Sequence, residues 1–425
     1  ALLRGLAFDC PALAEQLSGM GQHWIDEADS KSGTMGLGRD LAALADIRAG
    51  IKDASYASWE ATATLGTMQE LRSSRWIHTD VLRAAESTRR LGSGRSCERS
   101  TAPVTFARPR KDDPLGCLTV PPGSFAKKCL RKQRPCVLRG QAASFLQPHE
   151  GPLGSLDRWV SLAGDAPVRV SFTFQGADAN STSSLNAIEA TAEFFDREDV
   201  RNSLREMGFE APDVESVPWT LVRPGNWWMR LRDLVVWLRA GHPPGRGLYM
   251  NQLMLVDLGV EALAELREPS WVAEAGLELL SPSLWLAGRG IGGGGAVTTG
   301  YHYDAPENLL AQLAGEKEVI LLRPSEVEHL AYLDGVADVE AAAELDADGG
   351  VHSAGLRIGN RTSAGHSMVD AGNPGKAAQF PEYAKASGVS CHIAAGDVLY
   401  IPAFWHHAVA TMADETCAGL SLNLW

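Results

Sequence analysis

The chain has 425 residues, of which 45% are hydrophobic and 21% charged, a mixture typical of a globular protein with a sizeable core. It contains no run of about 18 apolar residues, so the sequence predicts no membrane-spanning helix and no membrane partner. The formal net charge of −13 argues against a surface that is basic throughout, which would suit nucleic acid.

The seven cysteines form no CxxC pair and no spacing typical of a zinc site. An odd, scattered set in a chain of this length predicts a reducing compartment, so we expect a cytoplasmic or nuclear protein. No signal peptide is visible, and the sequence starts at Ala1 without a methionine. The sequence therefore leaves targeting open.

Residues 1–90 predict an α-helical N-terminal extension, because apolar residues recur at helical spacing, for instance within 65–85. Residues 91–115 are rich in Gly, Ser, Pro and Arg and lack periodicity, which predicts a basic flexible linker. Between Arg83 and Arg139 the chain has 14 Lys and Arg against four Asp and Glu. A solvated linker and a contact surface for RNA or an acidic partner both fit this stretch.

From residue 116 onward, short β-rich runs predict a catalytic domain, 116–425, built as a sandwich or barrel. The predicted strands are 136–139, 168–174, 249–256, 284–287, 297–303, 309–313, 318–322, 398–401 and 420–425. Helical periodicity predicts helices over 185–208 and 228–239. Residues 333–380, dominated by Gly, Ala, Asp and Ser, predict a long insertion between strands.

Two short segments of this domain carry residues that can bind a metal. His302 and Asp304 are separated by one residue on a predicted strand, so both side chains point to the same face. A third ligand is needed, and a second segment ends in the adjacent histidines His406 and His407. Two imidazoles and a carboxylate leave positions open, as suits a non-haem Fe(II) that also binds a cosubstrate and O₂. For the first pair alone, a hydrogen-bonded core histidine is the alternative.

Several polar residues stand in otherwise apolar strands. Lys317 begins such a strand, where a buried lysine needs an anionic partner unless it reaches back to solvent. The distal carboxylate of a 2-oxo diacid offers such a partner, and the Thr299 hydroxyl can donate to the same group. The amides of Asn308 and Asn423 also need partners when buried. A bound acid or a structural cross-strand hydrogen bond would satisfy them.

The domain resembles the Jumonji-C oxygenases of the small hydroxylase branch in three stretches, HYDAPENLLAQLAGEKEVILLRPSEVEHL, GDVLYIPAFWHHAV and LSLNLW. That branch includes the asparaginyl hydroxylase of hypoxia-inducible factor, the Jumonji-C lysyl hydroxylases and the tRNA wybutosine-synthesising hydroxylase. The resemblance implies a mainly β fold with flanking helices, namely a double-stranded β-helix (jelly roll, cupin-like). It also implies the cofactors Fe(II), 2-oxoglutarate and O₂.

The resemblance assigns the iron to His302, Asp304 and His407. In the family the second histidine follows the proline of an Ile-Pro pair by five residues, which selects His407 over His406.

The resemblance assigns the distal carboxylate of 2-oxoglutarate to Lys317 and Thr299, with help from Tyr249. Asn308 and Asn423 resemble polar residues near the iron-chelating end of the cosubstrate.

The expected function is hydroxylation of a protein side chain, which we favour over hydroxylation of tRNA of the wybutosine type. In this superfamily the carboxylate two residues after the first histidine is mostly Asp in hydroxylases, as at Asp304, whereas many demethylases carry Glu there. Demethylation of lysine is therefore the lesser alternative, and a non-catalytic cupin binding module is a further one. A homodimer is expected because relatives often pair through helices that flank the barrel.

Overall fold

The computed structural model describes residues 106–109, 111–113, 116–172, 174–175, 181–183, 186–189, 192–206, 219–224, 226–239, 247–279, 282–288, 295–332, 337–345, 351–362, 365–414 and 418–425. The predicted helical extension, and all of the predicted linker except its end, lie outside these residues. The predicted domain boundaries therefore stay predictions.

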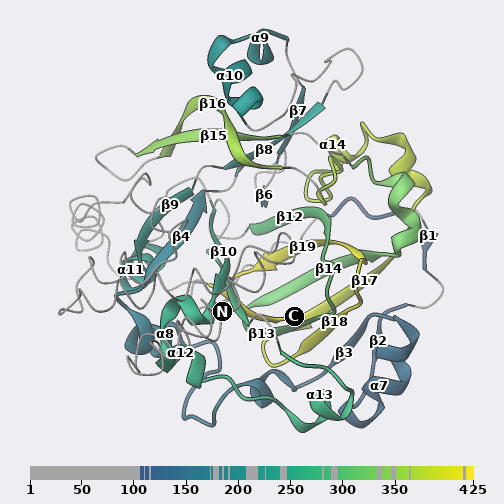
Figure 1. The fold of residues 1–425 in the computed structure, drawn as a ribbon. Helices are drawn as coiled ribbons and strands as arrows, with labels where there is room; N and C mark the ends of the chain where they lie inside the picture. Colours follow the sequence, from purple (N-terminus) through teal and green to yellow (C-terminus); the bar gives the residue numbers. More distant parts are fainter. Residues whose placement is uncertain are drawn as a thin grey trace, which may run out of the picture.

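Two β-sheets that face each other form the centre of the molecule (Figure 1). Within the described residues, the larger sheet has nine strands in the spatial order β2 (Leu118–Thr119), β3 (Cys136–Leu138), β18 (Val398–Ile401), β13 (Asn308–Ala314), β20 (Gly419–Leu424), β11 (Ser283–Ala287), β10 (Leu248–Met254), β4 (Pro167–Phe172) and β9 (Asn226–Arg230).

The smaller sheet has seven described strands, in the order β1 (Lys111–Asp112), β17 (Ser387–Ala394), β14 (Glu316–Leu322), β19 (His406–Met412), β12 (Ala296–Tyr303), β6 (Ser181–Ser183) and β5 (Phe174–Gln175). The central strands of both sheets pair antiparallel: β13 with β18 and β20, and β19 with β12 and β14. Two antiparallel sheets packed face to face confirm the predicted jelly roll.

Strand β14 shows how the sequence is buried in this sandwich. Val319 and Leu321 belong to the apolar cluster between the sheets, together with Leu399 of β18. Ile320 and Leu322 point the other way and pack in a second cluster, on the outer face of the smaller sheet. A strand segment buried on both faces has no polar alternation, which is why residues 319–322 of β14 are continuously apolar.

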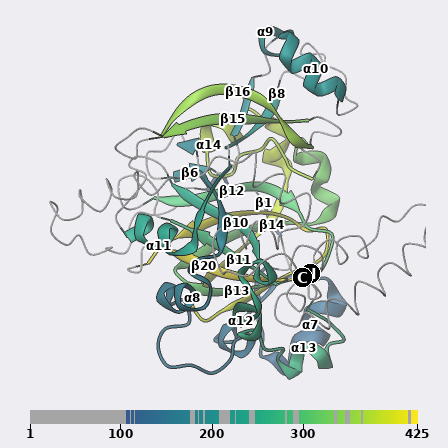
Figure 2. The same cartoon turned by 60° about the vertical axis from the view of Figure 1, so that its left-hand side comes forward.

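Short helices cover the outer face of the larger sheet (Figures 1 and 2). They are α7 (Phe125–Lys128), α8 (Leu156–Ala163), α11 (Leu231–Arg239), α12 (Val260–Ala264) and α13 (Ser270–Glu274), with the 3-10 turns η1 (Pro122–Ser124), η2 (Leu130–Lys132), η3 (Ala142–Phe145) and η4 (Leu255–Leu258). Trp159 of α8 and Leu234 of α11 share one buried cluster with Leu309 of β13. The largest apolar cluster of the described residues therefore lies between the larger sheet and these helices, outside the barrel.

A third sheet lies at one end of the molecule, at the top of Figures 1 and 2. Its described strands are β16 (Val351–Thr362), β15 (Ala337–Leu345), β8 (Trp219–Pro224) and β7 (Asn186–Glu189), next to the helices α9 (Ala192–Phe195) and α10 (Glu198–Glu206). The helix predicted over 185–208 is therefore wrong at its start, where β7 lies. The helix predicted over 228–239 begins late, because residues 226–230 form β9.

The predicted insertion over 333–380 separates β14 from β17, as expected, but it is more ordered than its composition suggested. It contains the hairpin of β15 and β16 and the helix α14 (Pro374–Ala377), and it lies between the turns η6 (Pro324–His329) and η7 (Pro381–Lys385). Tertiary pairing of β15 with β8 supports strands that small residues alone do not predict.

Four cysteines form two disulfides, Cys117–Cys391 and Cys129–Cys136. The prediction of reduced cysteines is wrong for these four, since folding joins residues 274 positions apart that no spacing in the sequence reveals. Disulfides are rare in reducing compartments, so the cysteines no longer support a cytoplasmic or nuclear location. Within the described part of the chain, no helix is long and apolar enough to cross a membrane.

Candidate metal centre and cosubstrate pocket

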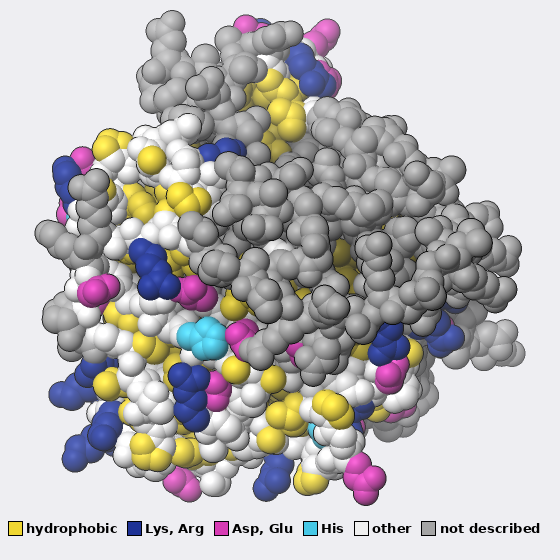
Figure 3. Space-filling view, turned by 180° about the vertical axis from the view of Figure 1, so that it is seen from behind, with side chains coloured by type: hydrophobic (Ala, Val, Ile, Leu, Met, Phe, Trp, Pro, Cys, Tyr) yellow, Lys and Arg dark blue, Asp and Glu magenta, His cyan; other side chains and the backbone are white. Residues whose placement is uncertain are grey.

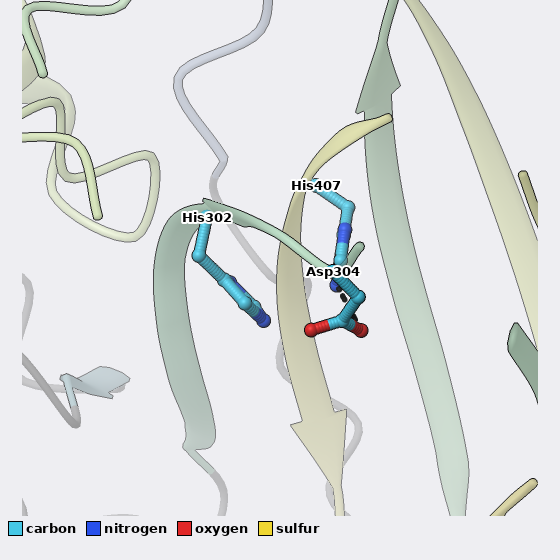
Figure 4. A group of neighbouring side chains, drawn as sticks. All are labelled: His302, Asp304 and His407. Carbon is cyan, nitrogen blue, oxygen red and sulfur yellow. Dashed lines mark ion pairs between the residues drawn. The ribbon is translucent and has the colours of Figure 1, made fainter. Parts of the chain in front are cut away.

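Strands β12 and β19 bring three candidate metal ligands together at one end of the barrel interior (Figure 4). His302 of β12 pairs directly opposite His407 of β19, and Asp304 follows the end of β12. One ligand atom from each residue lies within 4.8 Å of the others. Two imidazoles and one carboxylate at this spacing can hold a metal ion and leave part of its coordination sphere open.

A bulge in β12 decides which of its residues face the barrel interior. The register of the β12–β19 pairing shifts between Thr299 and His302. In a regular strand, residues three positions apart point to opposite faces. The shift therefore allows both side chains to face the interior, which the sequence alone could not show.

Both imidazoles are oriented by the backbone. His302 Nδ1 lies 3.0 Å from the carbonyl oxygen of Gly300, and His407 Nδ1 lies 2.9 Å from that of Trp405. Since a carbonyl can only accept, each Nδ1 carries the proton, and each Nε2 keeps a free lone pair for a metal. Burial, with the neighbouring His302, lowers the pKa of His407 to about 4, so this imidazole is neutral at pH 7.

Asp304 is held as a carboxylate. Burial raises its pKa, but His407, His302 and the amide of Asn308 lower it by more, so the net shift is downward. Asn308 Nδ2 donates to Asp304 Oδ2 over 3.2 Å, and His407 Nε2 lies 3.7 Å from the same oxygen. Asn308 Oδ1 is buried and has no hydrogen-bond partner within the described residues. An unsatisfied acceptor beside the triad marks a place for a bound donor, such as a metal-bound water.

His406, the neighbour of the third ligand candidate, faces away from the triad. Its Nε2 lies 3.3 Å from the carbonyl oxygen of Pro324 and must donate to it. Its Nδ1 therefore accepts the hydrogen bond from the Tyr332 hydroxyl over 2.7 Å. The structure places His407, and not His406, with His302 and Asp304.

Lys317 is buried farther along the same interior face. It is 3% exposed, and its Nζ donates to Thr411 Oγ1 over 2.8 Å. Burial lowers the pKa of Lys317 to about 7, and no carboxylate of the described residues pairs with it. Thr411 is four residues beyond His407 on β19, so the lysine end of the pocket lies about 13 Å along the strand from the metal end. A buried cation without a counter-ion is costly and calls for a bound anion.

Tyr249 and Thr299 meet near this lysine from opposite sheets. Tyr249 belongs to β10, and burial raises the pKa of its phenol, while a hydrogen bond with Thr299 works in the opposite direction. Val297, two residues before Thr299, pairs with Thr411, the partner of Lys317. The three residues predicted to hold a distal carboxylate thus lie in one region of the barrel.

The two amides predicted near the metal both face the interior from the larger sheet. Asn423 pairs opposite Leu310, which belongs to the cluster between the sheets. Asn308 lies two residues before Leu310 on the same strand and therefore on the same face. Only Asn308 contacts the triad through a hydrogen bond, which is the one to Asp304.

Two glycines close the barrel behind Lys317. A Cβ at Gly419 of β20 would collide with the methyl group of Thr411, and a Cβ at Gly315 would meet the backbone of Met412 and Gly419. Gly315 also has a φ of +71°, which favours glycine. The two sheets therefore approach each other closely at this end of the barrel.

The opposite end of the barrel carries a group of aromatic side chains, which we call the aromatic rim: Tyr303, Tyr332, Phe404 and His406. The ring of Tyr303 lies 5.8 Å from that of Tyr332, 5.8 Å from that of His406 and 6.2 Å from that of Phe404. The exposed fractions of Tyr303 and Phe404 are 38% and 51%. His406 is 3% exposed and faces away from the triad, so Tyr303 and Phe404 are the members of this group that are open to contact with a substrate.

Sequence reasoning missed some residues of this site. Thr411 has a detectable signal, because it repeats the two-residue period from His407 on the same strand. His366 stacks on His302 with ring centroids 5.6 Å apart, but it comes from the insertion, and no local pattern relates it to the triad. The aromatic rim likewise gathers residues from three separate segments.

Facing sheets with antiparallel central strands and a His-Asp-His group at one end have the architecture of a cupin-like domain. A family model described as a cupin-like domain matches residues 122–425. The chain therefore belongs to the cupin-like domain family.

Similar curated proteins carry two kinds of name. The chain is 32% identical over 124 residues to "tRNA wybutosine-synthesizing protein 5" of Gallus gallus and 30% identical over 121 residues to that of Homo sapiens. It is 29% identical over 165 residues to "Lysine-specific demethylase JMJ32" of Arabidopsis thaliana. The alignments cover 29%, 28% and 36% of this chain, and 28%, 28% and 44% of the three relatives. The chain thus spans less than half the length of these relatives.

Proposed function

We propose that the chain is an Fe(II)- and 2-oxoglutarate-dependent dioxygenase that hydroxylates its substrate. The observation that carries the proposal is the pairing of two features in one barrel: a His-Asp-His group, and a buried lysine at the far end of the same interior face. A metal alone explains the first feature, but only an anionic cosubstrate that reaches from metal to lysine explains both.

His302, Asp304 and His407 would hold the iron, and the donor set fits it. In both histidines Nδ1 donates to a backbone carbonyl, which directs Nε2 toward the metal position, and the aspartate is ionised. When bound, iron supplies the redox chemistry by which O₂, 2-oxoglutarate and a substrate C–H group give succinate, CO₂ and a C–OH group. Asn308 keeps Asp304 in orientation through its amide.

Lys317 would hold the distal carboxylate of 2-oxoglutarate, together with Thr299, Thr411 and Tyr249. A charge-assisted hydrogen bond from a buried ammonium is stronger than one between neutral groups. The anion would in turn stabilise the charged lysine and raise its pKa from about 7. The closed barrel end behind Lys317 fixes the length of acid that fits.

Two classes of substrate enter the proposal. Hydroxylation of a protein side chain is the class that the sequence analysis favours, and nothing in the iron site depends on that choice. Hydroxylation of tRNA is the second candidate, supported by the names of the two vertebrate relatives. Lysine demethylation is supported by the name of the plant relative. A non-catalytic binding module would not explain the buried Lys317.

Anaerobic calorimetry tests the proposal without knowledge of the substrate. Protein loaded with Fe(II), or with Mn(II) as a redox-silent substitute, is titrated with 2-oxoglutarate and with glutarate, which lacks the 2-oxo group. We expect 2-oxoglutarate to bind at least ~10-fold more tightly, since only it chelates the metal, and Asp304→Ala to remove that preference. Equal binding of both acids, with or without metal, would contradict the proposal.

A further inference from the structure

A short basic segment lies beside the candidate site. Residues 127–134, with the sequence KKCLRKQR, contain five cations and no acidic residue; we call this segment the basic turn. Lys127, Lys128, Arg131 and Lys132 are exposed, and none pairs with a carboxylate of the described residues. Figure 3 shows Lys and Arg side chains gathered at the lower left, the side on which α7 lies when Figure 1 is viewed from behind.

The basic turn is a fixed structure. The Cys129–Cys136 disulfide closes it, and the backbone N–H of Arg134 donates to the carbonyl of Cys129 over 3.1 Å. Gln133 has a φ of 47°, in the left-handed region that few residues adopt without a reason. Cations on a constrained backbone lose less conformational freedom when they bind than cations on a flexible tail.

The side chain of Gln133 connects the basic turn to the loop that precedes β19. Gln133 Nε2 donates to Glu307 Oε1 over 2.7 Å. The other oxygen of Glu307 accepts from the Tyr400 hydroxyl over 2.6 Å and from the backbone N–H of Ala403 over 3.1 Å. Phe404 follows at once, and its backbone N–H donates to the carbonyl of Asp304 over 2.8 Å. The basic turn and the aromatic rim therefore flank the same mouth of the barrel.

Phe404 combines exposure with backbone strain. Its φ is +62°, although it is not glycine, and its side chain is 51% exposed. Residues held in such a conformation cost free energy and concentrate at functional sites. Tyr303, between the ligand candidates His302 and Asp304, lies beside it with ring centroids 6.2 Å apart. An exposed aromatic pair maintained at a cost is suited to stacking on a planar group.

We infer that the mouth of the site binds single-stranded RNA, with phosphates on the basic turn and a base stacked on the aromatic rim. This rests on the proposed function and names its substrate class. Negative charges that alternate with planar rings match a constrained basic segment beside exposed aromatic rings. An acidic peptide would match the cations but not the exposed stacking faces, and the net charge of −13 makes a basic segment at the mouth a local feature.

Fluorescence anisotropy with a labelled single-stranded RNA of about 15 nucleotides tests the basic turn, since single-strand sites span about 4–16 nucleotides. The variant Lys127→Gln/Lys128→Gln/Arg131→Gln/Lys132→Gln should bind at least ~10-fold more weakly at low salt, and the salt slope should fall by roughly 0.7 for each phosphate that the variant no longer neutralises. The control is Arg201→Gln/Arg205→Gln on α10, which removes two exposed cations at the opposite end of the molecule and is compared per charge removed. It should bind as the unmodified protein does.

A second readout tests the aromatic rim. With 2-aminopurine in the RNA, stacking quenches its fluorescence, and Phe404→Leu should relieve the quenching and weaken binding by roughly fivefold or more. The control Val327→Ala changes another exposed apolar residue and should have no effect.

Equal loss of affinity in both charge variants, unchanged affinity in the basic-turn variant, or binding of an acidic peptide pool in place of RNA would overturn the inference. Because RNA binding is measured without iron or 2-oxoglutarate, failure of the proposed chemistry is seen separately.

Discussion

Lys317 is the residue whose position is hardest to explain without a ligand. It is buried, and within the described residues its Nζ bonds to a neutral hydroxyl, that of Thr411, and to no carboxylate. Lys317→Met removes the charge but keeps the length and apolar stem of the side chain. Since a hydrogen bond to a charged group contributes about 1.5–3 kcal/mol, the KM for 2-oxoglutarate should rise roughly 10- to 150-fold. Metal affinity, measured by calorimetry, should stay the same.

Thr411→Val is the matched control for Lys317→Met, because it removes one hydroxyl and leaves the cation. The rise in KM should be several-fold smaller than for the lysine variant. A larger effect of Thr411→Val than of Lys317→Met would contradict the assignment of the cation to the cosubstrate.

The lowered pKa of Lys317 predicts a pH dependence of cosubstrate binding. Burial lowers this pKa to about 7 in the free protein, so the ammonium loses its proton as pH rises above 7. Binding of the anion must then restore that proton, and the Kd for 2-oxoglutarate should rise about tenfold per pH unit above 7. The unfolded chain keeps its lysine protonated up to higher pH, so this residue makes folding more favourable as pH rises above 7.

Calorimetry between pH 6 and 9 in buffers of different ionisation enthalpy measures both the affinity and the proton uptake. Lys317→Met is the control and should show no such slope. Proton release in place of uptake would show that another group governs the titration.

The adjacent histidines His406 and His407 offer a direct test of the metal site. His407→Ala should lower metal affinity by at least ~10-fold, because it removes one of three ligands. His406→Ala should leave metal affinity unchanged, since His406 is bonded to Tyr332 and Pro324 and faces away from the triad. Metal content after dialysis, measured on both variants, decides which of the two histidines is the ligand. Loss of metal in His406→Ala but not in His407→Ala would place the ligand at His406.

The sequence predicted three side chains that the structure brings together, but it did not predict what surrounds them. Because residues two positions apart share a face of any strand, the sequence alone predicts that His302 and Asp304 point the same way. That Thr299 shares their face depends on a bulge, which is a tertiary feature. The stacking of His366 on His302 depends on the path of a long insertion and has no local signal.

Among the structural elements, the closed end of the barrel limits the cosubstrate pocket. Gly419 of β20 lies against the Thr411 side chain, so Gly419→Ala must displace it and with it the partner of Lys317. Overpacking of this kind costs about 1–3 kcal/mol in stability. The KM for 2-oxoglutarate should rise while metal affinity is preserved.

Gly123→Ala is the control for Gly419→Ala, because a Cβ at Gly123 meets nothing within 4 Å. Steady-state kinetics and thermal melts compare the two variants. If Gly419→Ala leaves the KM for 2-oxoglutarate unchanged, as Gly123→Ala should, close packing of the sheets at Gly419 does not limit cosubstrate binding.

The strands of the barrel were predicted more reliably than those outside it. Strand β14 is buried on both faces, so its apolar run identifies it. Strand β17 was missed although Val389, Cys391 and Ile393 alternate with the exposed Ser390 and His392, the pattern of a half-buried strand. The hairpin of β15 and β16 consists of residues with little strand propensity, and pairing with β8 stabilises it from outside the segment.

In the whole molecule, the disulfides connect parts that are distant in sequence. Cys117–Cys391 joins the start of the domain to β17 across 274 residues, whereas Cys129–Cys136 spans seven. Cys117→Ser/Cys391→Ser should lower the free energy of unfolding by about 2–5 kcal/mol, and Cys129→Ser/Cys136→Ser by less, because the shorter loop restricts the unfolded chain less.

Chemical denaturation with and without a reductant measures both differences. Reductant should destabilise the unmodified protein by about as much as the two pairs of substitutions together. No effect of reductant would show that the four cysteines are thiols in solution.

Formation of succinate shows whether the barrel couples a metal to a 2-oxo acid. Purified protein is incubated with Fe(II), ascorbate, O₂ and 2-oxoglutarate, alone and with bulk tRNA or a peptide pool, beside Asp304→Ala and Lys317→Met. We expect iron-dependent succinate that one of the pools stimulates. Asp304→Ala should form none, and Lys317→Met should approach normal turnover only at high 2-oxoglutarate. Metal-loaded protein that forms no succinate with either pool, or full turnover in Asp304→Ala, would contradict the proposed function.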